Sequence, residues 1–328
     1  MSQTTETVTP TPAATATTVA VVSEARRKSL AKGFFATGFQ RFLNDRISFI
    51  ALVVFAIIVV FTLLGGVIND SLLHVDPNKS SPFDKFHAAG WVGKGYNAYK
   101  EYQVTHWLGT DEQGRDVLGR LLVAGQISLL VGFLTAAIVI VVGGVLGLLA
   151  GYYGAWVDDV INALVQILQN VPTFFLLIVL SVIFTPDPVT LSLLLGLTGW
   201  TGVTRLVRGT VLSVKNRDYV DAARVMGAGN NRIIFLHILP NALSVLLVSA
   251  ANAVAGTILA ESGLSALGFG VRPPTASWGN MLAGGVSYST QGYWWLVITP
   301  GLLIFATTLC IFLFADGLRD AFDPRLKE

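Results

Sequence analysis

The stretch NRDYVDAARVMG at residues 216–227, followed by ILPN at residues 238–241, is a long polar interval in an otherwise apolar half of the chain. Its first residue or Asp218 can cap a short helix, because Asn and Asp side chains accept hydrogen bonds from first-turn amides. Gly227 can supply the left-handed residue that ends such a helix. Pro240 stands where the next helix would begin, and there its missing N–H costs nothing. The pattern predicts a short helix, a sharp turn and a second helix.

Small side chains mark one flank of this predicted helix. Ala222 and Ala223 leave room for another surface to approach the backbone closely. Two interpretations remain open from these residues alone, because a motif match needs its structural context. The helix is either a docking element for a partner or a solvated helix within a loop.

The composition indicates a membrane protein. Of the 328 residues, 53% are hydrophobic and 13% are charged, whereas soluble domains carry about 25% charged residues. A net charge of +2, with basic residues spread along the chain, argues against nucleic-acid binding. The single cysteine, Cys310, excludes an internal disulfide and a thiolate metal cluster. The four histidines are scattered in sequence, so no metal site is expected, and no catalytic residues are proposed.

Apolar runs predict the fold class. A membrane-spanning helix needs about 20 mostly apolar residues. Six runs meet this length, at 47–68, 122–150, 160–184, 189–212, 241–262 and 293–315. We therefore predict an all-α, polytopic membrane protein with six transmembrane helices in contact with membrane lipid. An even number of spans places both termini on the same side.

The distribution of Lys and Arg predicts the orientation. With the N-terminus inside, fifteen of the 22 basic residues fall in cytoplasmic segments and seven fall outside. An excess of basic residues on the cytoplasmic side is the rule for such proteins. Both termini and the 216–228 helix are therefore predicted to be cytoplasmic.

The flanking segments are interpreted from their composition. Residues 1–25 are rich in Thr, Ala and Pro and are predicted to be a disordered tail. Residues 26–46 mix basic with aromatic side chains, which is typical of an interfacial helix. Residues 69–121 form an extracytoplasmic segment, residues 122–316 form a five-helix core, and residues 317–328 form a cytoplasmic tail.

The extracytoplasmic segment carries two further signals. Its Tyr and Trp residues are expected to anchor at the membrane interface, with a partner-binding surface as the alternative. Thr110 and Gln113 have capping-box spacing, which predicts that a helix begins there and continues into the second span.

Small side chains and amide side chains recur at helical spacing in the predicted spans. Gly143, Gly147 and Gly151 recur every four residues, so they share a helix face on which backbones can approach closely. Amide and hydroxyl side chains form stripes in the third and fifth spans, and these candidate pathway residues are Asn162, Gln166, Gln169, Asn170, Ser249 and Asn252. Such stripes either bond between helices or line a water-filled path, and both interpretations remain open.

The charged residues in the predicted spans bear on the energy source that a transporter of this composition would use. Glu261 is placed near the outer interface, where it is expected to pair with Arg272 or to accept hydrogen bonds. No predicted span carries an acid near its middle, which argues against a proton-coupled pump. The chain also lacks a phosphate-binding loop of the form GxxxxGK[ST], so if it is a transporter its driving force is expected to enter from a separate ATPase.

The opening stretch resembles the EAA loop of binding-protein-dependent ABC importer permeases. The likeness rests on Asp221-Ala222-Ala223, on Gly227 four residues later, and on Leu239-Pro240. Asp221 stands where the pattern has Glu, and His237 stands where it has Ile. Neither departure changes the spacing.

A wider resemblance covers residues 105–328. This part looks like the C-type permease subunit of dipeptide and oligopeptide ABC importers. The matching segments are His106, 108–111, 114–116, 219–241, 258–265, 269–271, Pro273-Pro274, 277–282, 316–320 and 323–325. The resemblance implies a type I importer fold, in which Asp221, Ala222, Ala223 and Gly227 lie in a coupling helix that fits a groove on the ATPase.

The same resemblance implies the location, which is a bacterial or archaeal plasma (inner) membrane, as well as the partners and the cofactors. The partners are a homologous second permease subunit, two ABC ATPase subunits and an extracytoplasmic solute-binding protein. The chain itself is expected to hold no cofactor, and ATP and Mg are used by the partner ATPases. Nickel, haem or oligosaccharide importers of the same type remain alternatives. From other classes, a passive channel or secondary transporter, and a membrane anchor or sensor, remain rivals.

Overall fold

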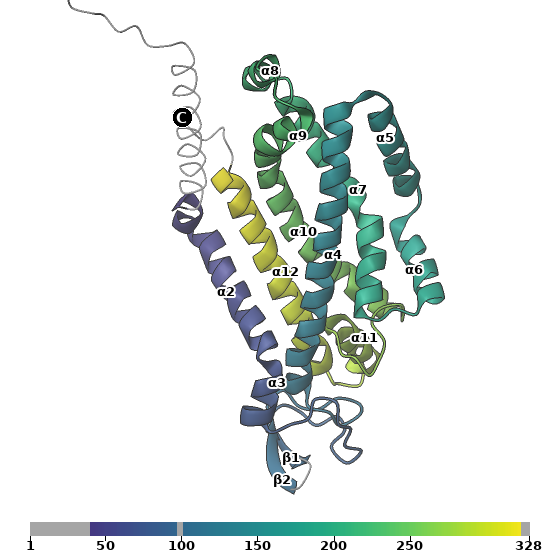
Figure 1. Cartoon of the computed structure of the whole chain (residues 1–328). Helices are drawn as coiled ribbons and strands as arrows, with labels where there is room; N and C mark the ends of the chain where they lie inside the picture. Colours follow the sequence, from purple (N-terminus) through teal and green to yellow (C-terminus); the bar gives the residue numbers. More distant parts are fainter. Residues whose placement is uncertain (1–39, 97–100, 323–328) are drawn as a thin grey trace, which may run out of the picture.

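The computed structural model describes residues 40–96 and 101–322, and these form a bundle of long helices. The longest are α2 (Arg46–Leu63), α4 (Val117–Tyr153), α7 (Pro188–Val214), α10 (Leu239–Ala266) and α12 (Trp295–Phe322). Figure 1 shows a short helix, α8 (Asp218–Val225), at one end of the bundle and a β-hairpin at the other, which we call the α8 end and the hairpin end. The predicted tail at 1–25 and most of the predicted helix at 26–46 lie outside the described residues.

The helices confirm a polytopic membrane protein, although the count of six spans is not reached on length and apolar character alone. Within the described residues four helical stretches qualify: Arg46–Leu63, Val117–Tyr153, Asn230–Ala266 and Trp295–Ala321. A fifth candidate is the bent pair α5 (Ala155–Asn170) and α6 (Thr173–Phe184). The predicted span at 189–212 is a continuous helix within α7, but its hydroxyl and Arg side chains leave it outside this set.

The predicted span at 160–184 is wrong as a single helix. Its two halves, α5 and α6, meet at an angle of 83°. Between them Val171 is extended (φ −87°, ψ 123°) and Pro172 follows. Proline disfavours the α conformation of the residue before it, so the helix ends at Asn170.

The hairpin end contains strands that the sequence analysis did not predict. Strands β1 (Trp91–Tyr96) and β2 (Glu101–His106) pair antiparallel, with Trp91 opposite His106. A π-helical turn, Asn69–Leu73, follows the short helix α3 (Gly65–Ile68) that continues α2. The fold is therefore helical with one small hairpin.

The helix predicted to begin at Thr110 begins at Val117 instead. Thr110 forms an isolated bridge with Asp116, and Asp111 Oδ1 accepts hydrogen bonds from the amides of Gln113 and Arg115 in a turn. Asp116 is the true cap, because its Oδ1 accepts the Gly119 amide at 2.6 Å. A local turn around Asp111 thus takes the place of the predicted capping box.

Asp187 and Pro188 set the start of α7. The Asp187 carboxylate accepts hydrogen bonds from the amides of Thr190 and Val189, and these bonds lower the pKa of its carboxyl. Pro188 occupies the first turn, where no N–H is needed. The helix that leads toward α8 therefore starts at a defined residue.

The glycine face predicted on the second span is confirmed as a packing surface. A Cβ at Gly147 would lie 2.7 Å from both Thr204 O and Val207 Cβ. Gly143 and Gly151 meet Val203 and Val211 of α7 in the same way. The three glycines therefore let α4 and α7 pack backbone to backbone.

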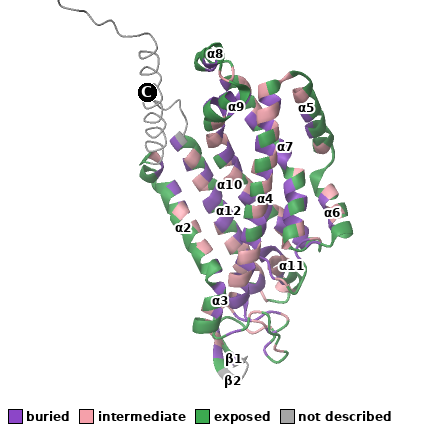
Figure 2. Cartoon of the chain, viewed as in Figure 1, coloured by how far each residue is buried: buried purple, intermediate pink, exposed green. Residues whose placement is uncertain are grey.

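A buried tryptophan organises the hairpin half of the bundle. Trp278, the first residue of α11 (Trp278–Ser289), is fully buried. Its indole N–H donates to Leu121 O and its amide donates to Ser128 Oγ, both at 3.0 Å. These bonds fix α11 against α4, whereas α5 and α6 remain mostly exposed at the edge of the bundle (Figure 2).

Candidate coupling helix and pathway face

The predicted coupling helix is α8 (Asp218–Val225), and its start differs from the prediction. Neither Asn216 nor Asp218 caps it, because the cap residue is Arg217, with no side-chain hydrogen bond. Asn216 Nδ2 instead donates to Leu212 O at 3.5 Å. Asp218 and Asp221 lie in the first turn, where a carboxylate interacts favourably with the helix dipole.

The end of α8 confirms the predicted glycine stop. Gly227 has a φ of 82°, in the left-handed region that favours glycine. Its N–H donates to Arg224 O at 2.9 Å, and the Ala228 N–H donates to Ala223 O at 3.0 Å. The chain therefore reverses sharply at Gly227 and enters α9 (Asn230–Ile233).

The two faces of α8 have different environments. Val220 and Ala223 are buried, and Val220 belongs to the same buried apolar cluster as Val211 and Ile238. Ala222 and Asp221 are exposed. The expectation that both alanines offer a flank to a partner is corrected, because Ala223 faces its own subunit.

Two apolar side chains that the sequence analysis missed complete the outer face. Val225 is 89% exposed and Met226 is 74% exposed at the tip of α8. The signal available in the sequence was their position, directly before Gly227. Together they form a small exposed apolar surface at the end of α8.

A polar contact ties α8 to the start of α10. Asn241 Nδ2 donates to His237 O at 2.7 Å and to Tyr219 Oη at 3.3 Å. His237 is buried in the π-helical turn Ile234–Ile238, so its ring points into the subunit. Leu239 is half-buried, and Pro240 is exposed in the first turn of α10, as predicted.

Most of the amide stripe of α5 is exposed and does not pack against the rest of this chain. Asn162 is half-buried and donates to Asp158 O at 2.9 Å. Gln166, Gln169 and Asn170 are exposed, and among the described residues no hydrogen bond to their side chains is found. These three amides are therefore free to face water or another subunit.

The α10 stripe is divided between core and surface. Ser249 is buried and Asn252 is exposed. Within the described residues no hydrogen bond joins either side chain to the amides of α5. The polar stripes of α5 and α10 are therefore not hydrogen-bonded to each other within the described part of the subunit.

Glu261 is buried at the hairpin end of α10. Its Oε1 accepts hydrogen bonds from Ser265 Oγ and Ser277 Oγ, both at 2.7 Å. Arg272, the predicted alternative partner, is exposed. The hydrogen-bonding expectation is confirmed, and Glu261 links α10 to the cap residue of α11.

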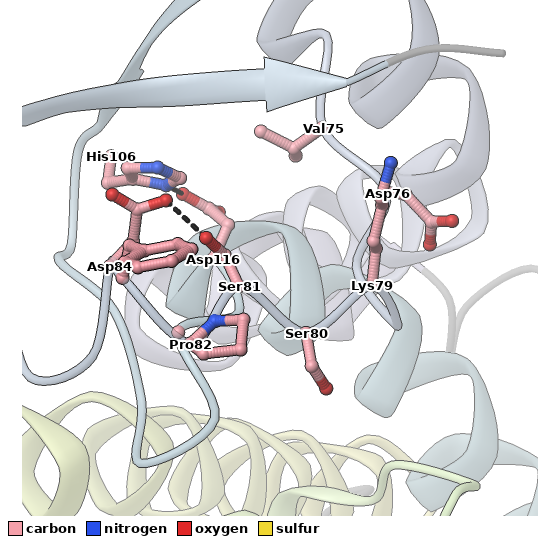
Figure 3. Close-up of a pocket in the computed structure, with 11 residues that line it drawn as sticks. Val75, Asp76, Lys79, Ser80, Ser81, Pro82, Asp84, His106 and Asp116 are labelled. Carbon is pink, nitrogen blue, oxygen red and sulfur yellow. Dashed lines mark hydrogen bonds and ion pairs between the residues drawn. The ribbon is translucent and has the colours of Figure 1, made fainter.

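A cavity of about 180 Å³ lies at the hairpin end (Figure 3), and Figure 1 shows that this end is opposite α8. His106 Nδ1 lies 2.8 Å from Asp116 Oδ2, and Ser81 Oγ donates to Asp84 Oδ2 at 2.5 Å (Figure 3). Among the described residues, no group of three or more His, Cys, Asp or Glu side chains could hold a metal ion. The cavity lies between the loop at residues 75–84 and the residues His106, Gly114 and Asp116, which precede α4.

Comparisons with known proteins identify the family. A family described as "Binding-protein-dependent transport system inner membrane component" matches residues 143–328. The dipeptide transport system permease protein DppC of Bacillus subtilis is 40% identical over 223 residues, which cover 68% of this chain and 70% of the relative. The oligopeptide transport system permease protein OppC of the same organism is 37% identical over 232 residues, covering 71% and 76%.

A longer match extends into the N-terminal part. The dipeptide transport system permease protein DppC of Lactococcus lactis subsp. cremoris is 32% identical over 319 residues, covering 91% of this chain and 92% of the relative. Family match, identity and the membrane-spanning helices agree. The chain belongs to the family of inner membrane components of binding-protein-dependent transport systems, as a multi-pass permease rather than an enzyme.

Proposed function

We propose that this chain is the permease subunit of an ATP-driven, binding-protein-dependent importer of di- or oligopeptides. Family membership supports the importer, and the relatives named for dipeptide and oligopeptide transport support the peptide cargo. A homologous second permease shares the translocation pathway, an extracytoplasmic binding protein delivers the cargo, and two separate ATPase subunits supply energy from ATP and Mg²⁺.

The geometry of α8 is the observation that supports coupling most directly. One face is anchored in the subunit by Val220 and Ala223, while Val225 and Met226 project from the other. A helix held this way can transmit a push to the bundle, because its inner face cannot slide freely. Asp221, Ala222, Val225 and Met226 form the contact with the ATPase, and Gly227 makes the turn behind them.

The exposed amides indicate where the pathway lies. Gln166, Gln169 and Asn170 have no side-chain hydrogen bond among the described residues of this chain. In the transporter they line the path between the two permeases. Amide groups donate and accept hydrogen bonds without adding charge. Such a lining suits peptides, whose backbones are themselves amides. ATP binding then alternates access to this path by moving α8.

The orientation follows from the basic residues. The α8 end carries the start of α2 and the end of α12 (Figure 1). With this end in the cytoplasm, fifteen of the 22 Lys and Arg residues are cytoplasmic. The hairpin and the loop before α11 then face the binding protein.

Uptake by the complete transporter tests the proposal. The chain is purified with its partner permease and ATPases and reconstituted with the binding protein in liposomes. We expect ATP-dependent accumulation of short labelled peptides, and no accumulation of nickel, haem or oligosaccharide. Transport of one of these cargoes in place of peptides would overturn the peptide assignment. Transport that continues without ATP would overturn the importer mechanism.

A further inference from the structure

Helices α5 and α6 form an arm that is sparsely attached to the bundle. In α5 only Ile161 and Val165 are buried, and in α6 only Leu177 and Ser181. The arm leaves α4 through Gly154, whose φ of 63° and ψ of −154° suit glycine alone. Figure 1 shows both helices at the edge of the bundle beside α7. The orientation of the arm therefore depends on few contacts.

One ion pair holds this arm against α7. Arg208 Nε lies 2.5 Å from Asp158 Oδ1, and Arg208 Nη2 lies 2.5 Å from Asp158 Oδ2. Asp158 is 16% exposed and Arg208 is 31% exposed. A two-bonded, partly shielded pair of this kind is stronger and more directional than a surface contact. Within the described residues, no second ion pair joins α5 or α6 to the rest of the chain.

The carboxylate of Asp158 lies next to the amide stripe. Asn162 Nδ2 donates to the Asp158 carbonyl oxygen at 2.9 Å and to its Oδ1 at 2.5 Å. Asn162 begins the row that continues through Gln166 and Gln169 along α5. The ion pair is therefore positioned to set the direction in which that row faces.

Arg208, the other member of the ion pair, lies on α7, which is packed against α4 and leads into α8. Lys215 follows α7 directly, and its Nζ donates to Gly151 O of α4 at 2.8 Å. Val214 and Val220 are buried in one cluster on either side of the α7–α8 connection. Because close-packed elements do not deform continuously, α4, α7 and α8 move together. A displacement of α8 therefore reaches Arg208.

We propose that the Asp158–Arg208 pair is the tether through which movement of α8 turns the amide-bearing α5. Asp158 and Arg208 are then positioning residues: they contact no cargo, and they act through the helix that does. The inference rests on the proposed importer function and adds the route by which force crosses the subunit. Breaking the tether leaves the ATPase docked and active while the pathway no longer follows it.

The first test measures uptake per ATP hydrolysed in the reconstituted transporter. Asp158→Asn and Arg208→Gln each remove one charge, and Asp158→Arg with Arg208→Asp restores the pair in reverse. We expect each single variant to lower the ratio about tenfold or more, as for loss of a charge-assisted hydrogen bond. The reversed pair recovers much of it, and Arg208→Lys, which keeps the charge without the second bond, lies between.

Matched controls are available on the same helices. Asp159→Asn removes the neighbouring exposed carboxylate, and Arg205→Gln removes an exposed guanidinium one turn earlier on α7. Both leave the ratio of uptake to hydrolysis at the parent value. An equal loss in the controls would mean that local charge, rather than the tether, matters, and would overturn the proposal.

The second test needs no cargo. With Cys310→Ala as the background, Gln169→Cys reports the position of α5 through the rate at which the introduced thiol reacts with a small thiol reagent. We expect the rate to differ between the nucleotide-free and ATP-trapped states, and Asp158→Asn to abolish that difference while ATP hydrolysis continues. The tether would be overturned if the reaction rate in the parent is the same in both nucleotide states, or if the difference between the states survives in Asp158→Asn. It would also be overturned if the reversed pair restores neither the rate difference nor the ratio of uptake to ATP hydrolysis.

The two tests separate this inference from the proposed cargo. If the parent transporter carries no peptide but the nucleotide-dependent rate at Gln169 is present and lost in Asp158→Asn, only the peptide assignment fails. If peptides are carried and the rate difference is insensitive to Asp158, only the tether fails.

Discussion

At the scale of single residues, the two faces of α8 predict opposite phenotypes. Val225→Asp or Met226→Asp places a charge where an apolar contact with the ATPase forms. We therefore expect these variants to have normal abundance in the membrane and to lose uptake. Ala223→Asp buries a carboxylate inside its own subunit, which costs several kcal/mol unless it is paired. Abundance of this variant should therefore fall. Immunoblotting of membranes together with co-purification of the ATPase distinguishes the two; normal ATPase binding by both tip variants would contradict the docking face.

Gly227 makes a second prediction from a single backbone angle. Its φ of 82° costs a side chain about 1–2 kcal/mol, and most of all a β-branched one. Space is not limiting, because a Cβ there would meet nothing within 4 Å. We therefore expect Gly227→Val to reduce ATPase binding and uptake, and Gly227→Asn to be milder because Asn tolerates this conformation. Equal uptake by the two variants would show that the backbone angle is unimportant.

At the scale of elements, the α4–α7 seam is the part most sensitive to added volume. Gly147→Ala brings a methyl group to 2.7 Å from Thr204 O and Val207 Cβ. Overpacking of this kind typically costs about 1–3 kcal/mol, so the Tm of the purified transporter should fall. Gly202→Ala on α7 is the matched control, because its methyl group enters open space. A Tm for Gly147→Ala as high as that of the control would show that the helices separate easily.

Local sequence rules predicted those elements whose causes are local. The glycine spacing of α4 and the Gly227 stop both follow from backbone geometry, and the structure confirms them. The break at Pro172 was hidden by a long apolar run, although the residue before a proline resists the α conformation. The start of α4 was misplaced because Asp111 Oδ1 accepts the Gln113 amide and the Thr110 amide donates to His87 O, so no capping box forms there. The Asp158–Arg208 pair joins residues fifty positions apart, and no spacing rule reveals it.

At the scale of the whole molecule, the exposed surfaces describe a subunit that is incomplete alone. Apolar side chains remain exposed along α2, α5 and α6, including Ile57, Ile167 and Phe175. Lipid can cover such a surface, but it cannot satisfy the exposed amides of α5. The amide row therefore requires either water or a second subunit beside α5. This combination of lipid-compatible helices and one polar strip is what a shared pathway between two permeases needs.

Topology is the prediction that tests this arrangement as a whole. In the Cys310→Ala background, a cysteine at Phe83, which is 94% exposed at the hairpin end, should react with a membrane-impermeant thiol reagent in intact cells. A cysteine at the exposed Asn216, between α7 and α8, should react only after the membrane is permeabilised. The excess of Lys and Arg at the α8 end is the physical reason, since basic loops stay on the cytoplasmic side. The reverse pattern would place α8 beyond the reach of any cytoplasmic ATPase, and the coupling role would fall with it.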